Sequence, residues 1–272
     1  MVGWQKCEYL IERPSSSEKL NHTSIQQSAE TSCLQEITKH ESARALNSNN
    51  FTGGIPPTLG QLSNLFLLDL TANQLSGEIP VSTSSTPGLD QLVGTKHFHF
   101  GDNQLTGPIS ESLFNANMTL IHVYFQNNKF TDPIPESLGL VQTLQIILLD
   151  ENQFSGSVPK NVGYLRNLTG LNLASNLLSG TVPDLSNATQ LNYVDLSNNK
   201  FASSPAPGWF STLTSLNTLT FSFRGFSKRI GGDLTSLYSN LTSKGLNPLQ
   251  SPSKPEQEHG LNGFTGIWTI MV

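Results

Sequence analysis

The residues of this 272-residue chain best suited to chemistry are three of its six histidines. His97 and His99 alternate in the segment HFH, and His122 stands in the later segment HVY. A neutral imidazole binds metal ions, and it gains a proton near pH 6.5. Three such groups brought together could form a proton-sensitive recognition patch, and the geometry also allows a three-histidine metal site. The alternative is that these polar residues only tile a solvated face.

Two adjacent acids, Asp150 and Glu151, are the next candidates. A pair of carboxylates can hydrolyse a glycosidic bond when the two groups flank that bond. Neighbouring residues of a strand point to different faces, and no second acid is positioned to complete such a pair. We therefore expect no catalytic residues and no enzymatic activity, and we interpret both acids as part of a binding surface.

These residues belong to a repeat, which must position them. Segments 144–159 and 168–183 carry the same Leu, Asn, Gly and Pro pattern at a shift of 24 residues (168 − 144). The pattern L-x-x-L-x-L-x-x-N-x-L-x-G-x-I-P is typical of a leucine-rich repeat. L-x-L puts two apolar side chains on one face of a short strand, and the Asn amide can bond backbone groups in the turn. Because one coil cannot bury its own apolar face, stacked coils sharing a parallel sheet are predicted.

The repeats set the domain organisation. Residues 43–237 are predicted to form an α/β-type solenoid of about seven repeats plus a degenerate last one. Residues 1–42 are expected to be a weakly ordered segment without repeats, and residues 238–272 a disordered tail. Arg44 falls where a core Leu belongs, so the first complete coil begins at Leu65. The turn of each coil carries a structural asparagine: Asn49, Asn73, Asn103, Asn128, Asn152, Asn176 and Asn199.

Aligning the coils stacks the outward-facing side chains into rows about 4.8 Å apart. The alignment puts His97 beside His122, and it puts His99 between Asp69 and Tyr124. Two neighbouring imidazoles resist double protonation, whereas Asp69 favours the charged form of His99. We therefore expect the patch to gain charge stepwise as the pH falls through about 6.5. The predicted ligand-binding surface, without metal or cofactor, comprises Asp69, His97, His99, His122, Tyr124, Asp150 and Glu151.

Composition excludes several classes of partner. Charged residues are 13% of the chain and the net charge is −5, which argues against nucleic acid and against a basic membrane patch. Cys7 and Cys33 could pair, but they match no metal-binding spacing. No run approaches the roughly 20 apolar residues of a membrane span, and the start lacks the apolar segment of a signal peptide. The six N-x-S/T sequons are about what chance gives, so they do not indicate secretion.

The chain resembles the ectodomains of plant leucine-rich repeat receptor-like kinases. The Ile-Pro ending with Ser/Thr-Gly before it is the plant-type repeat, and TKHFHFGDNQLTGPI, MTLIHVYF and SLGLVQTLQ resemble the subfamily often numbered VIII-1. The resemblance covers roughly residues 45–222. It implies a horseshoe with a parallel β-sheet on its concave face and an irregular or 3-10 convex side. It also implies a peptide, protein or cell-wall ligand, a co-receptor, and signalling from the outer side of the plasma membrane.

The chain departs from that pattern in four ways. It lacks the secretion signal, the cysteine-flanked caps, the membrane helix and the kinase. Without a Gly-rich phosphate loop, an H-R-D or a D-F-G motif, kinase activity is not implied. We interpret the chain as a non-catalytic recognition module, a truncated ectodomain that makes no direct membrane contact. The alternatives are a secreted inhibitor of wall-degrading enzymes, which would need a signal peptide and paired-Cys caps, and a non-functional truncated gene product.

Overall fold

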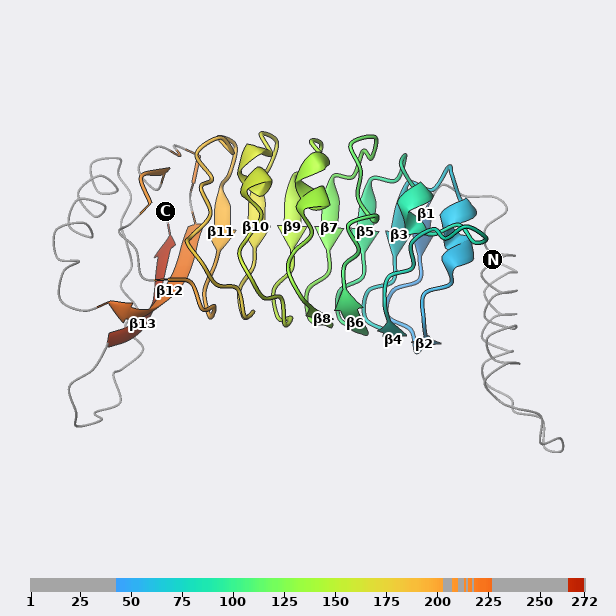
Figure 1. Cartoon of the computed structure of the whole chain (residues 1–272), viewed down its shortest axis with the longest axis horizontal. Coiled ribbons are helices and arrows are strands. Elements are labelled where there is room, and N and C mark those ends of the chain that lie inside the picture. Colours follow the sequence, from blue (N-terminus) through green and yellow to red (C-terminus); the bar gives the residue numbers. More distant parts are fainter. Residues whose placement is uncertain are drawn as a thin grey trace, which may run out of the picture.

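The computed structural model describes residues 43–202, 207–209, 213, 215–216, 218–226 and 264–271. The predicted N-terminal segment, both cysteines and residues 238–263 lie outside these ranges. Figure 1 shows the described part as a row of stacked coils, each contributing one strand to a continuous sheet. The solenoid predicted from the repeat is therefore confirmed. Within the described residues, no helix is long and apolar enough to cross a membrane.

The main sheet follows the order of the coils. Each strand pairs in parallel with the equivalent strand of the next coil, so that Leu171 lies opposite Ile147, 24 positions earlier (171 − 147). The last pair, β12 with β13, is antiparallel. The strands, in spatial order, are β1 (Ala43–Ala45), β3 (Leu67–Asp69), β5 (His97–His99), β7 (His122–Tyr124), β9 (Ile146–Leu148), β10 (Gly170–Asn172), β11 (Tyr193–Asp195), β12 (Thr218–Phe226) and β13 (Phe264–Met271).

The three-residue strands alternate as the L-x-L pattern predicts. In β3, β5, β7, β9 and β11 the central residue is buried and its two neighbours are half-buried on the concave face. The central side chains join one core that runs through all the coils. Burying a Leu, Val or Phe side chain contributes about 1.5–3 kcal/mol, so this stripe is a main source of stability. Leu149 and Leu173 continue the β9–β10 pairing, because the Leu149 amide donates to the Asn172 carbonyl at 2.9 Å.

Each turn is locked by its asparagine, as the sequence suggested. Asn176 Nδ2 donates to the carbonyl oxygens of Leu173 and Ala174 in its own coil, at 3.2 and 3.1 Å. The same Nδ2 donates to the Leu149 carbonyl of the preceding coil at 2.9 Å, and Asn176 Oδ1 accepts from the Phe154 amide at 3.0 Å. This side chain therefore satisfies buried backbone groups on both sides of the coil boundary.

The turns also contain two features that we did not predict. One is a short parallel sheet along the lower edge in Figure 1, formed by β2 (Thr52–Gly53), β4 (Gln74–Gly77), β6 (Gln104–Pro108) and β8 (Lys129–Thr131). The other is a left-handed backbone at the residue before each turn asparagine, with φ between 50° and 58° at Ser48, Ala72, Asp102, Asn127, Glu151, Ser175 and Asn198.

Short 3-10 helices lie on the convex side of several coils, opposite the concave sheet, as expected. They are η1 (Pro57–Gln61), η2 (Leu89–Gln91), η3 (Glu136–Leu140) and η4 (Lys160–Tyr164). Three of them follow the proline of the Ile-Pro or Val-Pro step, which is the N-cap residue and has an extended backbone. In η4, a Cβ at Gly163 would overlap the Asp184 carbonyl oxygen of the next coil, so the close stacking of these coils requires glycine there.

The two ends of the solenoid differ from expectation. Arg44 occupies a core register position opposite Leu68, yet β1 still forms, because its backbone pairs with β3. At the other end, residues 264–271 form β13 against β12, so part of the predicted tail 238–272 is a strand. An apolar segment can pair with an open sheet edge through its backbone. The prediction of a disordered tail did not allow for such pairing.

Candidate functional site

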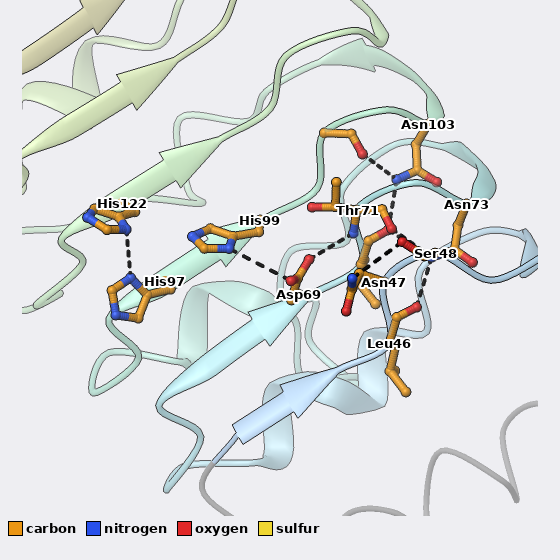
Figure 2. A network of polar contacts seen from close by, with 12 residues as sticks. Leu46, Asn47, Ser48, Asp69, Thr71, Asn73, His97, His99, Asn103 and His122 are labelled. Carbon is orange, nitrogen blue, oxygen red and sulfur yellow. Dashed lines mark hydrogen bonds and ion pairs between the residues drawn. The ribbon is translucent and has the colours of Figure 1, made fainter. Parts of the chain in front are cut away.

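The candidate site lies on the concave face over β3, β5 and β7. Each of these strands buries its central residue, so the two flanking side chains must project from the sheet. In the observed register His97 lies opposite His122, and His99 lies between Asp69 and Tyr124. Both neighbour relationships predicted from the alignment are confirmed, and Figure 2 shows the three imidazoles close together.

His97 and His122 contact each other directly. Their Nδ1 atoms are 3.0 Å apart, so one ring must donate a proton while the other accepts. The ring centroids are 4.6 Å apart, and Phe66 packs edge-on against His97 with a centroid distance of 5.2 Å. The Phe66 side chain is 48% exposed. The partly exposed ring of Phe66 therefore borders the histidines. The alignment of strand residues did not reveal this contact, because Phe66 precedes its strand.

His99 is held between an aromatic ring and an acid. Its imidazole stacks on Tyr124 with a centroid distance of 4.3 Å and an interplanar angle of 8°. Its Nδ1 lies 4.0 Å from Asp69 Oδ2. Its Nε2 is buried and has no hydrogen-bond partner. In Figure 2 this nitrogen is on the side of the ring that faces His97 and His122.

All three imidazoles favour the neutral form. Burial lowers the pKa of His99 to about 4, and it outweighs Asp69, which acts to raise that pKa. Burial also lowers the pKa of His97, and the charge of Lys96 lowers it further. Burial likewise lowers the pKa of His122, with a smaller contribution from His97. The prediction that the patch charges as the pH falls through about 6.5 is therefore wrong, because it treated the rings as fully solvated.

The two predicted acids lie further along the sheet. Asp150 follows β9 and is half-buried. The pKa of its carboxyl is raised to about 6, mainly by burial; a backbone hydrogen bond opposes this shift, and the charges of Glu151, Asp195 and Asp102 add to it. Glu151 is exposed in the left-handed turn, off the strand. The predicted site did not include Asp195 or Asp102.

The concave strands carry no lysine or arginine in their central part. The described residues of β3, β5, β7, β9, β10 and β11 include no Lys and no Arg, whereas Asp69 and Asp195 lie on these strands. Burial raises the pKa of Asp195, but Ser197 donates to its carboxylate through a backbone amide at 2.9 Å. The face therefore offers hydrogen-bond acceptors, neutral imidazoles and the rings of Tyr124 and Tyr193 to a ligand.

Comparison with known proteins agrees with this architecture. A family model described as Leucine Rich Repeat matches residues 190–213. A probable leucine-rich repeat receptor-like protein kinase of Arabidopsis thaliana is 61% identical over 136 residues, which is 50% of this chain and 14% of that protein. The structure of PEPR1–AtPEP1 matches with a TM-score of 0.60 and 34% identity, over 68% of this chain and 25% of that chain. The Arabidopsis receptor kinase HAESA, in complex with the peptide hormone IDA and the co-receptor SERK1, matches with a TM-score of 0.57 and 28% identity, over 66% of this chain and 30% of that chain.

The stacked coils, the parallel concave sheet and the turn asparagines define the chain as a plant-type leucine-rich repeat solenoid. The curated relatives that it matches are plant leucine-rich repeat receptor-like kinases, and its fold is consistent with a fragment of such an ectodomain. The matched segment spans 14% of the length of the Arabidopsis kinase.

Proposed function

We propose that this chain is a non-catalytic recognition module that binds an extended peptide along its concave sheet, as the extracellular part of a receptor would. The observation that carries the proposal is the row of half-buried side chains that project from β3, β5, β7, β9 and β11, with Asn172 as the half-buried residue of β10 between the last two. An extended peptide matches this surface, because strands spaced about 4.8 Å apart present side chains in regular rows.

The structural neighbours support a peptide rather than another ligand class. One was solved as PEPR1–AtPEP1, and another contains the peptide hormone IDA and the co-receptor SERK1. By analogy, a co-receptor is a second expected partner, and the expected location is the outer side of the plasma membrane. These roles belong to the neighbours, and for this chain they are part of the proposal.

The acidic residues of the concave side indicate which side chains the peptide should carry. Asp69, Asp150 and Asp195 line the concave side, and the six strands from β3 to β11 contain no Lys or Arg, although the charge of Lys96, directly before β5, reaches His97. Such a face favours a ligand with Lys or Arg side chains, because complementary charge attracts the right partner and repels acidic ones. Tyr124 and Tyr193 provide large, rigid contact surfaces of the kind that dominate binding energy at interfaces.

The test is a selection of randomised linear peptides, displayed on phage, against the purified chain. We expect enriched peptides to contain Lys or Arg beside an apolar residue, and their affinity to fall as the salt concentration rises. Enrichment of acidic peptides, or no enrichment at all, would contradict the proposal. In a parallel titration, binding of cell-wall oligosaccharides without any peptide binding would assign the concave face to a wall ligand instead.

A further inference from the structure

We propose that His97, His99 and His122 form a binding site for a divalent transition-metal ion such as Zn²⁺. This inference goes beyond the proposed peptide recognition and does not depend on it. One ring nitrogen from each of the three residues lies within 4.8 Å of those of the other two. The sequence alone led us to expect no metal, because it could not show how the imidazole rings are oriented.

The distances suit a tetrahedral ion. Zinc binds imidazole nitrogen at about 2.0–2.1 Å, which places two such ligands about 3.3 Å apart. The Nδ1 atoms of His97 and His122 are already 3.0 Å apart. His99 is the more distant ligand, because the three nitrogens lie within 4.8 Å of one another, and its ring must move closer for one ion to bind all three. A site with three histidines leaves one position open to water or to a ligand group.

The polar atoms around the cluster support the same inference. Without an ion, His99 Nε2 is buried and has no hydrogen-bond partner, which is costly for a polar atom. Its other nitrogen, Nδ1, faces Asp69 Oδ2 at 4.0 Å. Metal-binding histidines usually donate their second ring N–H to a carboxylate, which fixes the tautomer and the ring orientation. The 4.0 Å separation is too long for a hydrogen bond, so Asp69 is a candidate positioning residue that would accept the Nδ1 hydrogen only after the two groups move closer.

The protonation state and the donor type limit which ions fit. A histidine must be neutral to bind a metal, and burial lowers the pKa of all three rings. Three nitrogen donors suit zinc, copper or nickel, whereas calcium and magnesium prefer oxygen ligands. Tyr124 stacks on His99 and on His122, with centroid distances of 4.3 and 5.0 Å, and so restricts the movement of both rings.

The experiment is calorimetric titration of the chelator-stripped full chain with Zn²⁺. The triple variant H97A/H99A/H122A retains the chain's other three histidines and both cysteines, so its difference from the wild type reports the cluster alone. We expect the wild type to bind one more equivalent of Zn²⁺ than the triple variant. D69N is expected to weaken that binding by about tenfold, as loss of a partner to a metal-binding histidine usually does. The matched control Y193A, in the same row on β11, is expected to leave it unchanged.

Two further measurements guard against misfolding and nonspecific binding. All three histidines are only half-buried, so the triple variant should keep the wild-type circular dichroism spectrum. X-ray absorption at the zinc edge of the wild type should show nitrogen and oxygen ligands without sulfur. Equal zinc stoichiometry and affinity in the wild type and a folded triple variant would overturn the proposal, and so would a sulfur-containing ligand shell.

Discussion

Asn152 donates from its Nδ2 to the carbonyl oxygen of Phe125, in the preceding coil, at 3.0 Å. The same nitrogen donates to the Leu149 and Asp150 carbonyls of its own coil. Asn152 Oδ1 accepts from the amide of Phe130, again in the preceding coil, at 3.1 Å. One side chain therefore joins two coils at the point where the backbone leaves the concave sheet.

The first prediction concerns this asparagine. Asn152→Ala is expected to lower the free energy of unfolding by about 3 kcal/mol, because each buried backbone group left unsatisfied costs about 1–3 kcal/mol. The control is Asn49→Ala in the first described coil, where the asparagine is exposed and, among the described residues, its side chain donates only to Leu46 and Asn47. That variant should lose less than about 1 kcal/mol. Equal losses for the two variants in urea unfolding would contradict the role assigned to the turn asparagines.

The second prediction concerns the core stripe. Leu173 is 1% exposed, whereas Leu177, four residues later, is 41% exposed. Leu173→Asp would bury an unpaired carboxylate and is expected to destabilise the chain by more than about 4 kcal/mol. Leu177→Asp makes the same chemical change at the surface and should alter stability by less than about 0.5 kcal/mol. Thermal melting of both variants checks the assignment, and an unchanged melting temperature for Leu173→Asp would refute it.

The fold was largely predictable because the repeat constrains it. A shift of 24 residues fixed the parallel register, and the alternation of apolar residues identified the buried side of each strand. The second, shorter sheet was not predictable, since it depends on backbone hydrogen bonds between turns that carry no distinct side-chain pattern. The same is true of β13, which is far from β12 in sequence and pairs through its backbone.

The candidate site was predictable in position but not in chemistry. The alignment placed His97 beside His122 and His99 between Asp69 and Tyr124, as observed. It could not show that Tyr124 stacks flat on His99, or that burial outweighs Asp69 in setting the pKa of His99. Both depend on side-chain conformation, which strand alternation does not determine.

The third prediction concerns pH and Asp150. The pKa of its carboxyl rises from 3.8 to about 6 on folding, so the fold favours the protonated form. Well below the unfolded pKa of 3.8 the group is protonated in both states and carries no penalty. Stability is lost as the pH rises from about 4 to 6, and the full penalty remains above that. Asp150→Asn is therefore expected to stabilise the chain at pH 7.5 by about 1 kcal/mol, after allowance for solvent screening of a half-buried group.

The control and the contrary result for Asp150 follow from the same linkage. The stabilisation by Asp150→Asn should shrink when unfolding is measured at pH 4.5. Asp184 has a lowered pKa, because its carboxylate accepts hydrogen bonds from Ser186, so Asp184→Asn should not stabilise the chain at pH 7.5. An Asp150→Asn variant that is less stable than the wild type at pH 7.5 would show that the carboxylate is favourably bonded in the fold.

The central claim, that the ligand lies on the concave face, is tested most directly by one matched pair of tyrosines. Tyr124 projects from β7 on the concave side, and Tyr164 is 59% exposed at the end of η4 on the convex side. The measurement is the affinity of a peptide selected on the wild-type chain for Tyr124→Ala and for Tyr164→Ala. We expect at least about tenfold weaker binding for Tyr124→Ala, as for an aromatic residue at the centre of an interface, and less than about a twofold change for Tyr164→Ala. Unchanged affinity in Tyr124→Ala together with loss of binding in Tyr164→Ala would contradict the account and move the recognition surface to the convex side.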